Sequence, residues 1–287
     1  MNITGKAKVF GLVGHPVEHS MSPVLHHTLA DILGHELAYV PFDVNNDLES
    51  AIKGAFELNI QGLNVTVPYK QDVMKFLKDI DPLAKKIGAV NTLLRCKNGY
   101  KGYNTDMPGL KRAMENDGIK IKGANFYLIG AGGVARAAFL MLLENGAKRV
   151  HILNRSVEKA EALANDLEAG YDTMVTVGNL QSYKAFPLEN ATAIQATNVG
   201  MYPKTDDVVI EDIEFYEGID AAYDLIFNPA VTEFMNRADK CGKKAYNGLK
   251  MLLFQGIIAY EYWNNVSVSD DVAAKVYDTM LEELLRR

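Results

Sequence analysis

The chain has 287 residues, of which 48% are hydrophobic and 23% are charged. This composition suits one large or two ordinary globular domains with a substantial buried core, and it argues against a disordered chain. The formal net charge of −6 gives no general attraction to nucleic acid or anionic lipid, so an anionic ligand has to be held by local donors.

Cys96 and Cys241 lie far apart and outside any C-x-x-C spacing, which argues against a disulfide framework and a structural zinc site. Four histidines crowd residues 15 to 27, but no nearby carboxylate completes a familiar metal spacing, so we expect no metal. The sequence has no recognisable signal peptide or membrane span, and we expect a cytoplasmic protein.

The first part of the chain predicts alternating strands and helices, which makes an α/β unit. The strands are expected at 8–13, 38–44 and 62–67, and the helices at 23–33 and 47–58. Ser22 is the expected N-cap of the first helix, with Pro23 at its first position and Gly34 past its end. Ser20 stands just before this cap. Either both hydroxyls hold a carboxylate at the helix N-terminus, or Ser22 only caps the helix.

Residues 64–70, NVTVPYK, predict a strand that Pro68 stops. Lys70 therefore follows the carboxyl end of a strand, which is where open α/β sheets bind their ligands. The alternative is an ordinary solvated lysine in a loop.

Asn98-Gly99 lies between two β-prone runs and predicts a hairpin with these two residues as its loop. In that register opposed residue numbers sum to 197, so Asn91 faces Asp106. An amide beside a carboxylate suits a ligand with several hydroxyls. The alternative is that both are ordinary polar residues at strand ends.

Residues 126–137, FYLIGAGGVARA, are typical of a strand that turns sharply into a helix and binds a phosphate. Gly130 permits the turn, Gly132 lets a pyrophosphate approach the backbone, and Ala135 is small where helix and strand pack. The free N–H groups and the helix dipole face the anion. The residues predicted to bind the pyrophosphate are Gly130, Ala131, Gly132, Gly133, Val134 and Ala135, although a glycine turn also occurs for its geometry alone.

The strand predicted at 149–153 ends in Asn154, Arg155 and Ser156, where an NAD site normally carries an acidic residue. Ser156 is expected to cap the next helix, and Lys159 follows Arg155 by one turn. Two cations here suit the 2′-phosphate of NADP, with NAD as a secondary cofactor. The alternative is a solvated helix start.

Further strands are predicted near 173–177, 192–196 and 220–226, which makes this half a nucleotide-binding domain. A glycine turn follows the second of them and contains Thr197, Gly200 and Met201. This turn either passes close to a nicotinamide or is only a turn.

The last 40 residues predict two helices, one over 248–263 and a second from near Ser269. Gln255 lies within the apolar first helix, and a buried amide there needs a partner. That partner is either a ligand or the backbone.

Several of these motifs together resemble the shikimate dehydrogenase family over nearly the full chain. They are GHPVEHSMSP at 14–23, NVTVPYK at 64–70, GAVNT at 88–92, GYNTD at 102–106, GAGGVARA at 130–137, NRS at 154–156 with Lys159, and GLKMLLFQ at 248–255.

The resemblance implies an α/β protein with a substrate domain, a Rossmann-type doubly wound NADP-binding domain, and C-terminal helices that pack back on the first domain. The implied ranges are 1–106 with 248–287, and 107–247. It also implies reversible NADP-dependent reduction of 3-dehydroshikimate to shikimate, in the chorismate pathway to the aromatic amino acids, by a monomer or homodimer. The implied roles are Ser20 and Ser22 on the substrate carboxylate, Asn64, Asn91, Asp106 and Gln255 on its hydroxyls, Thr66 in contact with substrate, and Lys70 with Asp106 as the catalytic pair.

The sequence departs from the family pattern D-x-x-Y-x-P at 224–229, where Phe227 replaces the usual tyrosine. A hydroxyl near the substrate is therefore missing, which leaves quinate as an alternative or second substrate. A protein that senses NADP and a cyclic acid without catalysis is a rival interpretation, against which the intact Lys70 and Asp106 pair argues. A dehydrogenase of an unrelated small acid would leave Ser20, Asn91 and Gln255 without a shared purpose.

Overall fold

The computed structural model describes residues 3–286, and the chain divides into two compact units. Unit 1 comprises Met1–Gly109 with Leu253–Arg287, and unit 2 comprises Leu110–Leu252. Each unit is built on its own six-stranded sheet. The predicted α/β class is therefore confirmed.

The sheet of unit 1 is mixed and has the order β2-β1-β3-β5-β6-β4. Its strands are β1 (Lys8–Gly14), β2 (Leu37–Asp43), β3 (Gly62–Val65), β4 (Asp79–Ile80), β5 (Thr92–Cys96) and β6 (Gly99–Tyr103). β1 runs parallel to β2 and β3, whereas β5 runs antiparallel to β3 and β6. The carboxyl ends of β1 and β3 therefore lie at the same edge of the sheet. Thr66 and Lys70 follow β3 at this edge.

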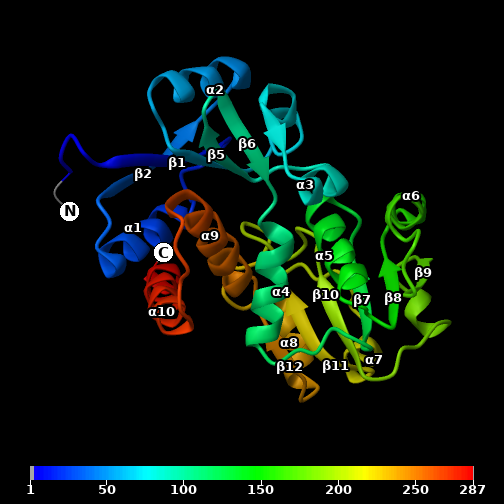
Figure 1. Cartoon of the computed structure of the whole chain (residues 1–287). Coiled ribbons are helices and arrows are strands. Elements are labelled where there is room, and N and C mark those ends of the chain that lie inside the picture. The colour runs from blue at the N-terminus through cyan, green and yellow to red at the C-terminus, as the bar shows by residue number, and fades with distance from the viewer. Residues whose placement is uncertain (1–2, 287) are drawn as a thin grey trace. The chain divides into compact units, whose positions relative to one another are not determined.

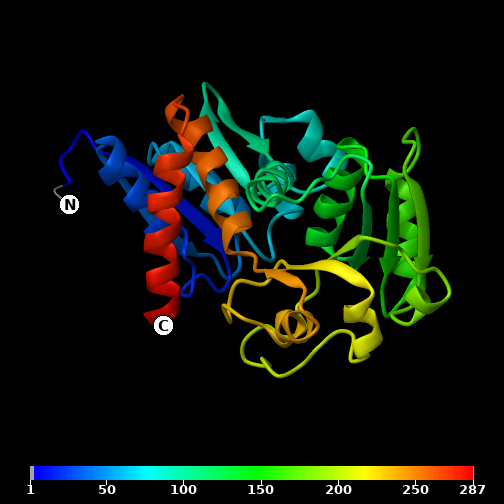
Figure 2. The same ribbon diagram turned by 90° about the horizontal axis from the view of Figure 1, so that it is seen from below.

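The helices that cover this sheet come from the N-terminal and the C-terminal parts of the sequence. They are α1 (Ser22–Leu33), α2 (Leu48–Glu57), α3 (Pro82–Ile87), the start of α4 (Asp106–Asn116), most of α9 (Leu249–Asn264) and α10 (Asp270–Arg286), with a 3-10 turn at Asp72–Phe76. In Figure 1 the C-terminal α10 lies beside the N-terminal α1, and Figure 2 shows α10 also beside α9. The indole of Trp263 in α9 fills the space beside Gly62, where a Cβ atom would come within 2.2 Å of it. The predicted C-terminal helices are thus part of this unit.

The first helix begins one residue earlier than expected. Ser22 is its first residue rather than its N-cap, which is Met21 and has no capping side chain. The Oγ atom of Ser20 instead accepts the N–H of Ser22 at 3.2 Å. Gly34 ends the helix in the left-handed conformation, with φ of 69°, as predicted.

The predicted hairpin register is wrong. Cys96 pairs with Gly99, so the loop is Lys97-Asn98 and opposed residue numbers sum to 195. A type I′ loop made of Asn98 and Gly99 would need a positive φ at both residues. Gly99 has φ of 138°, but Asn98 is not among the described residues with positive φ. Asn91 therefore does not face Asp106 across the hairpin, and its N–H donates to the carbonyl of Tyr103.

The sheet of unit 2 is entirely parallel and has the order β12-β11-β10-β7-β8-β9. Its strands are β7 (Asn125–Ile129), β8 (Arg149–Leu153), β9 (Met174–Gly178), β10 (Ala191–Gln195), β11 (Ile219–Asp224) and β12 (Lys244–Tyr246). The strand order reverses between β7 and β10, as in a doubly wound dinucleotide-binding fold, which binds its ligand at that reversal. The predicted Rossmann-type domain is confirmed.

Four helices belong wholly to unit 2, namely α5 (Gly133–Glu144), α6 (Val157–Leu167), α7 (Ile213–Glu217) and α8 (Glu233–Lys240). Figure 1 shows α5 and α6 beside the β7 to β9 strands, and α8 beside β11 and β12. Within residues 3–286 no helix combines the length and apolarity that a membrane crossing needs.

Candidate active site

Lys70 and Asp106 form a close ion pair in unit 1, with Nζ 2.7 Å from Oδ2. Lys70 lies in the turn after β3, and its carbonyl accepts the N–H of Val90. Asp106 is the first residue of α4. The two side chains are 26% and 12% exposed, so the pair is sheltered and still reachable from solvent.

Asn91 holds the other oxygen of the same carboxylate. Its Nδ2 donates to Oδ1 of Asp106 at 2.8 Å, while its own Oδ1 accepts the N–H of Thr105 at 2.8 Å. The backbone donor at Thr105 fixes which end of the amide faces Asp106. Asn91 and Asp106 thus meet as expected, but they meet because Asp106 starts a helix and not because the two are opposed in a hairpin.

Asn104 positions the start of α4, and sequence reasoning missed it. Its Oδ1 accepts the N–H groups of Asp106 and Met107 at 3.0 and 3.4 Å, and its Nδ2 donates to the carbonyl of Ala89 at 3.0 Å. An asparagine two residues before an acidic first turn is a recognisable capping signal. This cap fixes the backbone of the first turn of α4 and thereby the direction in which the side chain of Asp106 points.

Gln255 reaches the same cluster from α9. Its Oε1 lies 3.5 Å from both Nδ2 of Asn91 and Oγ1 of Thr105. The approach depends on Gly109 in α4, because a Cβ atom there would lie 2.7 Å from the backbone nitrogen of Gln255. The polar side chain in this apolar helix therefore has partners in the cluster.

Asn64 is 5% exposed and belongs to a second network beside the cluster. Its Oδ1 accepts the hydroxyl of Tyr39 at 2.7 Å and faces Nε2 of His26 at 3.2 Å. Its Nδ2 faces the hydroxyl of Thr92 at 3.2 Å and the carbonyl of Asn91 at 3.4 Å. Sequence reasoning missed Tyr39 and His26, because both look like ordinary core residues.

Thr66 lies just past β3, and its methyl group occupies the space beside Gly14, where a Cβ atom would come within 2.3 Å. Throughout residues 3–286 the hydroxyl of Thr66 has no hydrogen-bond partner, and the hydroxyl of Ser20 has no acceptor. Both groups can therefore bind a ligand.

His15 is paired with Asp43, with Nδ1 2.8 Å from Oδ1. In the described part of the chain no three His, Cys, Asp or Glu side chains gather closely enough to hold a metal ion.

The glycine turn of unit 2 joins β7 to α5. Gly130 has φ of 118°, and a Cβ atom there would lie 2.9 Å from the carbonyl oxygen of Ala196. Gly132 and Gly133 face open space, and no acceptor within residues 3–286 receives the N–H groups of Gly132, Gly133 or Val134. A helix N-terminus with free donors and no side chains in the way fits a pyrophosphate.

Arg155 and Lys159 are exposed beside the start of α6, and neither side chain has a partner in the described chain. Ser156 precedes the helix, but its hydroxyl donates to Glu158 at 2.9 Å and caps no backbone N–H, contrary to expectation. Asn154 closes the turn by donating to the carbonyl of Ser156 at 2.8 Å. Two uncommitted cations at this point fit a 2′-phosphate.

The turn after β10 is tied down by buried polar groups. Gln195 accepts the N–H of Thr197 at 2.5 Å and donates to the carbonyl of Val199 at 3.1 Å and to Asp224 at 3.3 Å. Asp224 also accepts the hydroxyl of Thr232 at 2.6 Å. Burial raises the pKa of Asp224 to about 6. The turn that carries Gly200 and the exposed Met201 is therefore hydrogen-bonded at its base.

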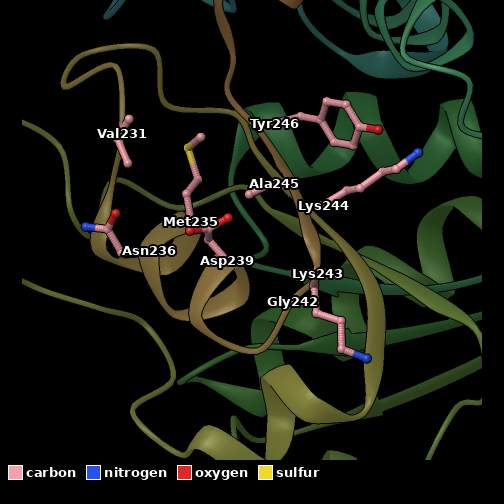
Figure 3. A pocket seen from close by; sticks show the side chains of 9 residues that line it. All are labelled: Val231, Met235, Asn236, Asp239, Gly242, Lys243, Lys244, Ala245 and Tyr246. Carbon is pink, nitrogen blue, oxygen red and sulfur yellow. The ribbon is translucent and has the colours of Figure 1, made fainter.

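A pocket of about 640 Å³ lies at the β12 edge of unit 2. It is lined by Val231, Met235, Asn236, Asp239, Gly242, Lys243, Lys244, Ala245 and Tyr246. In Figure 3 the amino groups of Lys243 and Lys244 point away from Met235 and Asp239. The pocket shares no residue with the glycine turn or its two cations and lacks converging positive charges, so it does not suit the cofactor.

The fold and the two polar clusters define an α/β dehydrogenase with a dinucleotide-binding domain. A family model described as "Shikimate dehydrogenase substrate binding domain" matches residues 12–93, and one described as "Shikimate / quinate 5-dehydrogenase" matches residues 111–199. This chain belongs to the shikimate dehydrogenase family.

Curated relatives named shikimate dehydrogenase (NADP(+)) match over almost the full length. The protein of Desulforamulus reducens is 42% identical over 96% of this chain and 96% of its own length. The protein of Methanobrevibacter smithii is 40% identical over 98% and 99%.

Solved structures agree with these relatives. A shikimate dehydrogenase in complex with NADP+ superposes with a TM-score of 0.89 at 37% identity, covering 99% of this chain and 98% of that one. The Thermus thermophilus enzyme in complex with NADP(H) and shikimate has a TM-score of 0.83 at 31% identity, covering 95% and 99%.

Proposed function

We propose that this chain is an NADP-dependent shikimate dehydrogenase that reversibly reduces 3-dehydroshikimate to shikimate. The observation that carries the proposal is the Lys70 and Asp106 pair, whose carboxylate is held on its other oxygen by Asn91. An ammonium and a carboxylate with fixed hydrogen bonds are the groups that proton transfer at a ring carbonyl requires. Full-length similarity to enzymes of this name supports the assignment.

In this proposal Lys70 gives the proton to the substrate oxygen during reduction and takes it back during oxidation. Its positive charge also stabilises the alkoxide character that develops on that oxygen. Asp106 orients the ammonium and accepts a hydrogen bond from a substrate hydroxyl. Asn91 keeps the carboxylate from turning away.

The polar groups around this pair are proposed to bind the rest of the substrate. Ser20 and Ser22 hold the carboxylate, and the free hydroxyl of Ser20 supports this role. Thr66 contacts the substrate with its unpaired hydroxyl. The side chains proposed to bind the substrate hydroxyls are Asn64, Asn91, Asp106 and Gln255.

Unit 2 is proposed to hold NADP. The pyrophosphate would lie on the N–H groups of the 130–135 turn, and Arg155 with Lys159 would bracket the 2′-phosphate beside Asn154 and Ser156. When bound, NADP(H) supplies the hydride chemistry of the reaction. The turn with Thr197, Gly200 and Met201 is proposed to adjoin the nicotinamide, and its fixed base supports that role.

Initial rates with shikimate and quinate, each with NADP+ and NAD+, test this function. We expect reduced cofactor to accumulate fastest with shikimate and NADP+, as followed by its near-ultraviolet absorbance. A faster rate with quinate would assign the chain to the quinate branch, for which Phe227 in place of tyrosine is the motivating feature. If neither acid led to reduction of the cofactor, the interpretation of a protein that senses NADP and a cyclic acid without catalysis would be favoured.

We further propose that the protein works in the cytoplasm as a monomer or homodimer. Its two unpaired cysteines fit a reducing compartment. Sedimentation equilibrium of the full chain separates the two oligomeric states.

A further inference from the structure

We propose that His26 and Tyr39 are positioning residues that hold the side-chain amide of Asn64 in one orientation. In that orientation the amide oxygen faces the interior, and the N–H groups face Asn91 and Thr92. Asn64 then acts only as a hydrogen-bond donor toward a bound ligand oxygen. The inference rests on the proposed function, in which Asn64 contacts the substrate.

The orientation of the amide follows from what surrounds it. Nδ2 of Asn64 faces the carbonyl oxygen of Asn91 at 3.4 Å, and a carbonyl can only accept a hydrogen bond. The nitrogen must therefore lie on that side. The oxygen consequently faces Tyr39 at 2.7 Å and His26 at 3.2 Å, so both of these groups must donate.

Both donors are fixed in their protonation state by burial. Tyr39 is 2% exposed, and burial raises the pKa of its phenol, so the hydroxyl keeps its proton. His26 is 1% exposed, and burial lowers the pKa of its ring to about 3, so the ring is neutral. A neutral ring has one N–H, and Nδ1 of His26 has no partner in the described chain. The proton therefore lies on Nε2, toward Asn64.

Aromatic packing prevents the ring of His26 from turning away. The ring stacks on Tyr39 with centroids 4.3 Å apart and a 21° interplanar angle, and it lies 5.0 Å from the ring of Trp263. Trp263 is itself held by its Nε1–H, which donates to the carbonyl of Leu93 at 2.9 Å. The donor from His26 is thus preorganised rather than adaptable.

Tyr39 also connects two parts of the proposed substrate site. Its phenol donates to Asn64 at 2.7 Å. Burial raises the pKa of this phenol, and the nearby side chain of Ser22 partly opposes that shift. On the other side of Asn64, the hydroxyl of Thr92 donates to Oδ1 of Asn91 at 3.1 Å. A ligand oxygen can replace the carbonyl of Asn91, at 3.4 Å, as the acceptor for Nδ2 of Asn64. It would then meet an N–H whose direction is fixed by the hydrogen bonds of His26 and Tyr39 to the amide oxygen.

Steady-state kinetics of three variants test the proposal. His26→Leu removes one donor to Asn64 and Tyr39→Phe removes the other, so we expect each to raise KM for shikimate roughly threefold to tenfold. kcat should change less, and KM for NADP should stay at the wild-type value. His26→Gln carries an amide N–H where Nε2 stood, so KM should return to within about twofold of wild type.

His35→Leu is the matched control. His35 lies in the same aromatic group, with Nδ1 2.7 Å from the hydroxyl of Tyr260, but it does not touch Asn64. Its loss should leave KM for shikimate unchanged. An unchanged KM in both His26→Leu and Tyr39→Phe overturns the proposal, and so does a His26→Gln protein as impaired as His26→Leu.

A nitrogen–proton correlation spectrum of the histidine rings gives a readout that needs no turnover. In the wild-type protein without substrate we expect the ring proton of His26 on Nε2, and a proton on Nδ1 overturns the proposal. If the wild-type protein failed to oxidise shikimate, the proposed function would fall, while this spectrum would still test the orientation of Asn64.

Discussion

Nδ2 of Asn91 donates to Oδ1 of Asp106 at 2.8 Å, which leaves Oδ2 of the same carboxylate for Lys70 at 2.7 Å. Each oxygen thus has its own charged or polar donor, and neither can move without breaking a bond. Asn91 is in turn oriented by the backbone N–H of Thr105. The direction of the Lys70 ammonium is therefore set by a chain of contacts that begins in the backbone.

Lys70→Ala should reduce kcat for shikimate oxidation by at least 100-fold, since positioned acid–base groups contribute about 10²–10⁴. Binding of NADP should stay near the wild-type affinity, as measured by fluorescence titration. Lys75→Ala is the control, because Lys75 is an exposed lysine a few residues further on, and within residues 3–286 it pairs only with Asp72. Near-normal turnover of the Lys70 variant would reject the assigned role.

Asp106→Asn should lower kcat by a similar order while preserving the fold. The amide keeps the shape of the side chain and still offers Asn91 an oxygen, but it presents an N–H to Lys70 instead of a carboxylate oxygen. The ammonium then loses the acceptor that orients it. Stopped-flow measurement of the hydride step checks this, and the melting temperature monitors folding. A variant with full activity would show that the carboxylate is only structural.

Arg155→Ala should weaken NADP binding by about 1.5–3 kcal/mol, which is the size of a hydrogen bond to a charged group, and should hardly affect NAD. Calorimetric titration with both cofactors measures the difference. Lys148→Ala serves as control, since Lys148 is an exposed lysine beside the opposite end of β8. Equal losses for NADP and NAD would argue against a 2′-phosphate site.

Much of the fold could be predicted because its local signals agree with one another. The apolar run before Gly130 and the small residues after it specify a strand, a turn and a helix with little competition from other structures. Gly34 likewise ended α1 where predicted, since it can take positive φ without strain.

The parts that could not be predicted depend on contacts between distant residues. Asn98-Gly99 signalled a hairpin correctly but gave the wrong register, because flanking strands and not the dipeptide decide the pairing. Ser22 resembled a cap, yet it is the first residue of α1, and Met21 is the N-cap. His26 and Tyr39 became recognisable as partners of Asn64 only once α1, β2 and β3 were placed together.

Gly109→Ala should raise KM for shikimate and lower the free energy of unfolding by about 1–3 kcal/mol, the usual cost of overpacking. The added methyl would lie 2.7–2.8 Å from the backbone of Gln255 and push α9 away from Asn91. Gly54→Ala is the matched control, because Gly54 is also helical but faces open space. That change should be neutral or stabilise by up to about 1 kcal/mol. Urea unfolding and initial rates measure both variants, and equal behaviour of the two would contradict the packing argument.

Asp224→Asn should change the pH dependence of stability. Burial raises the pKa of Asp224 from 3.8 to about 6, so the folded protein binds more protons than the unfolded chain between about pH 4 and 6. Its contribution to the free energy of unfolding therefore falls as pH rises through this range, and the loss is complete above the folded pKa. The difference between the two pKa values corresponds to a loss of roughly 3 kcal/mol in the free energy of unfolding. The neutral amide of the variant does not titrate and does not lose this free energy. The free energy of unfolding of the variant minus that of wild type should thus increase from pH 4.5 to 7, as measured by urea unfolding at each pH.

Asp212→Asn is the control, since its hydrogen bond from Lys184 lowers the pKa of Asp212 to about 2 and places its titration below this window. Parallel profiles for Asp224→Asn and wild type would mean that Asp224 is already ionised at pH 4.5.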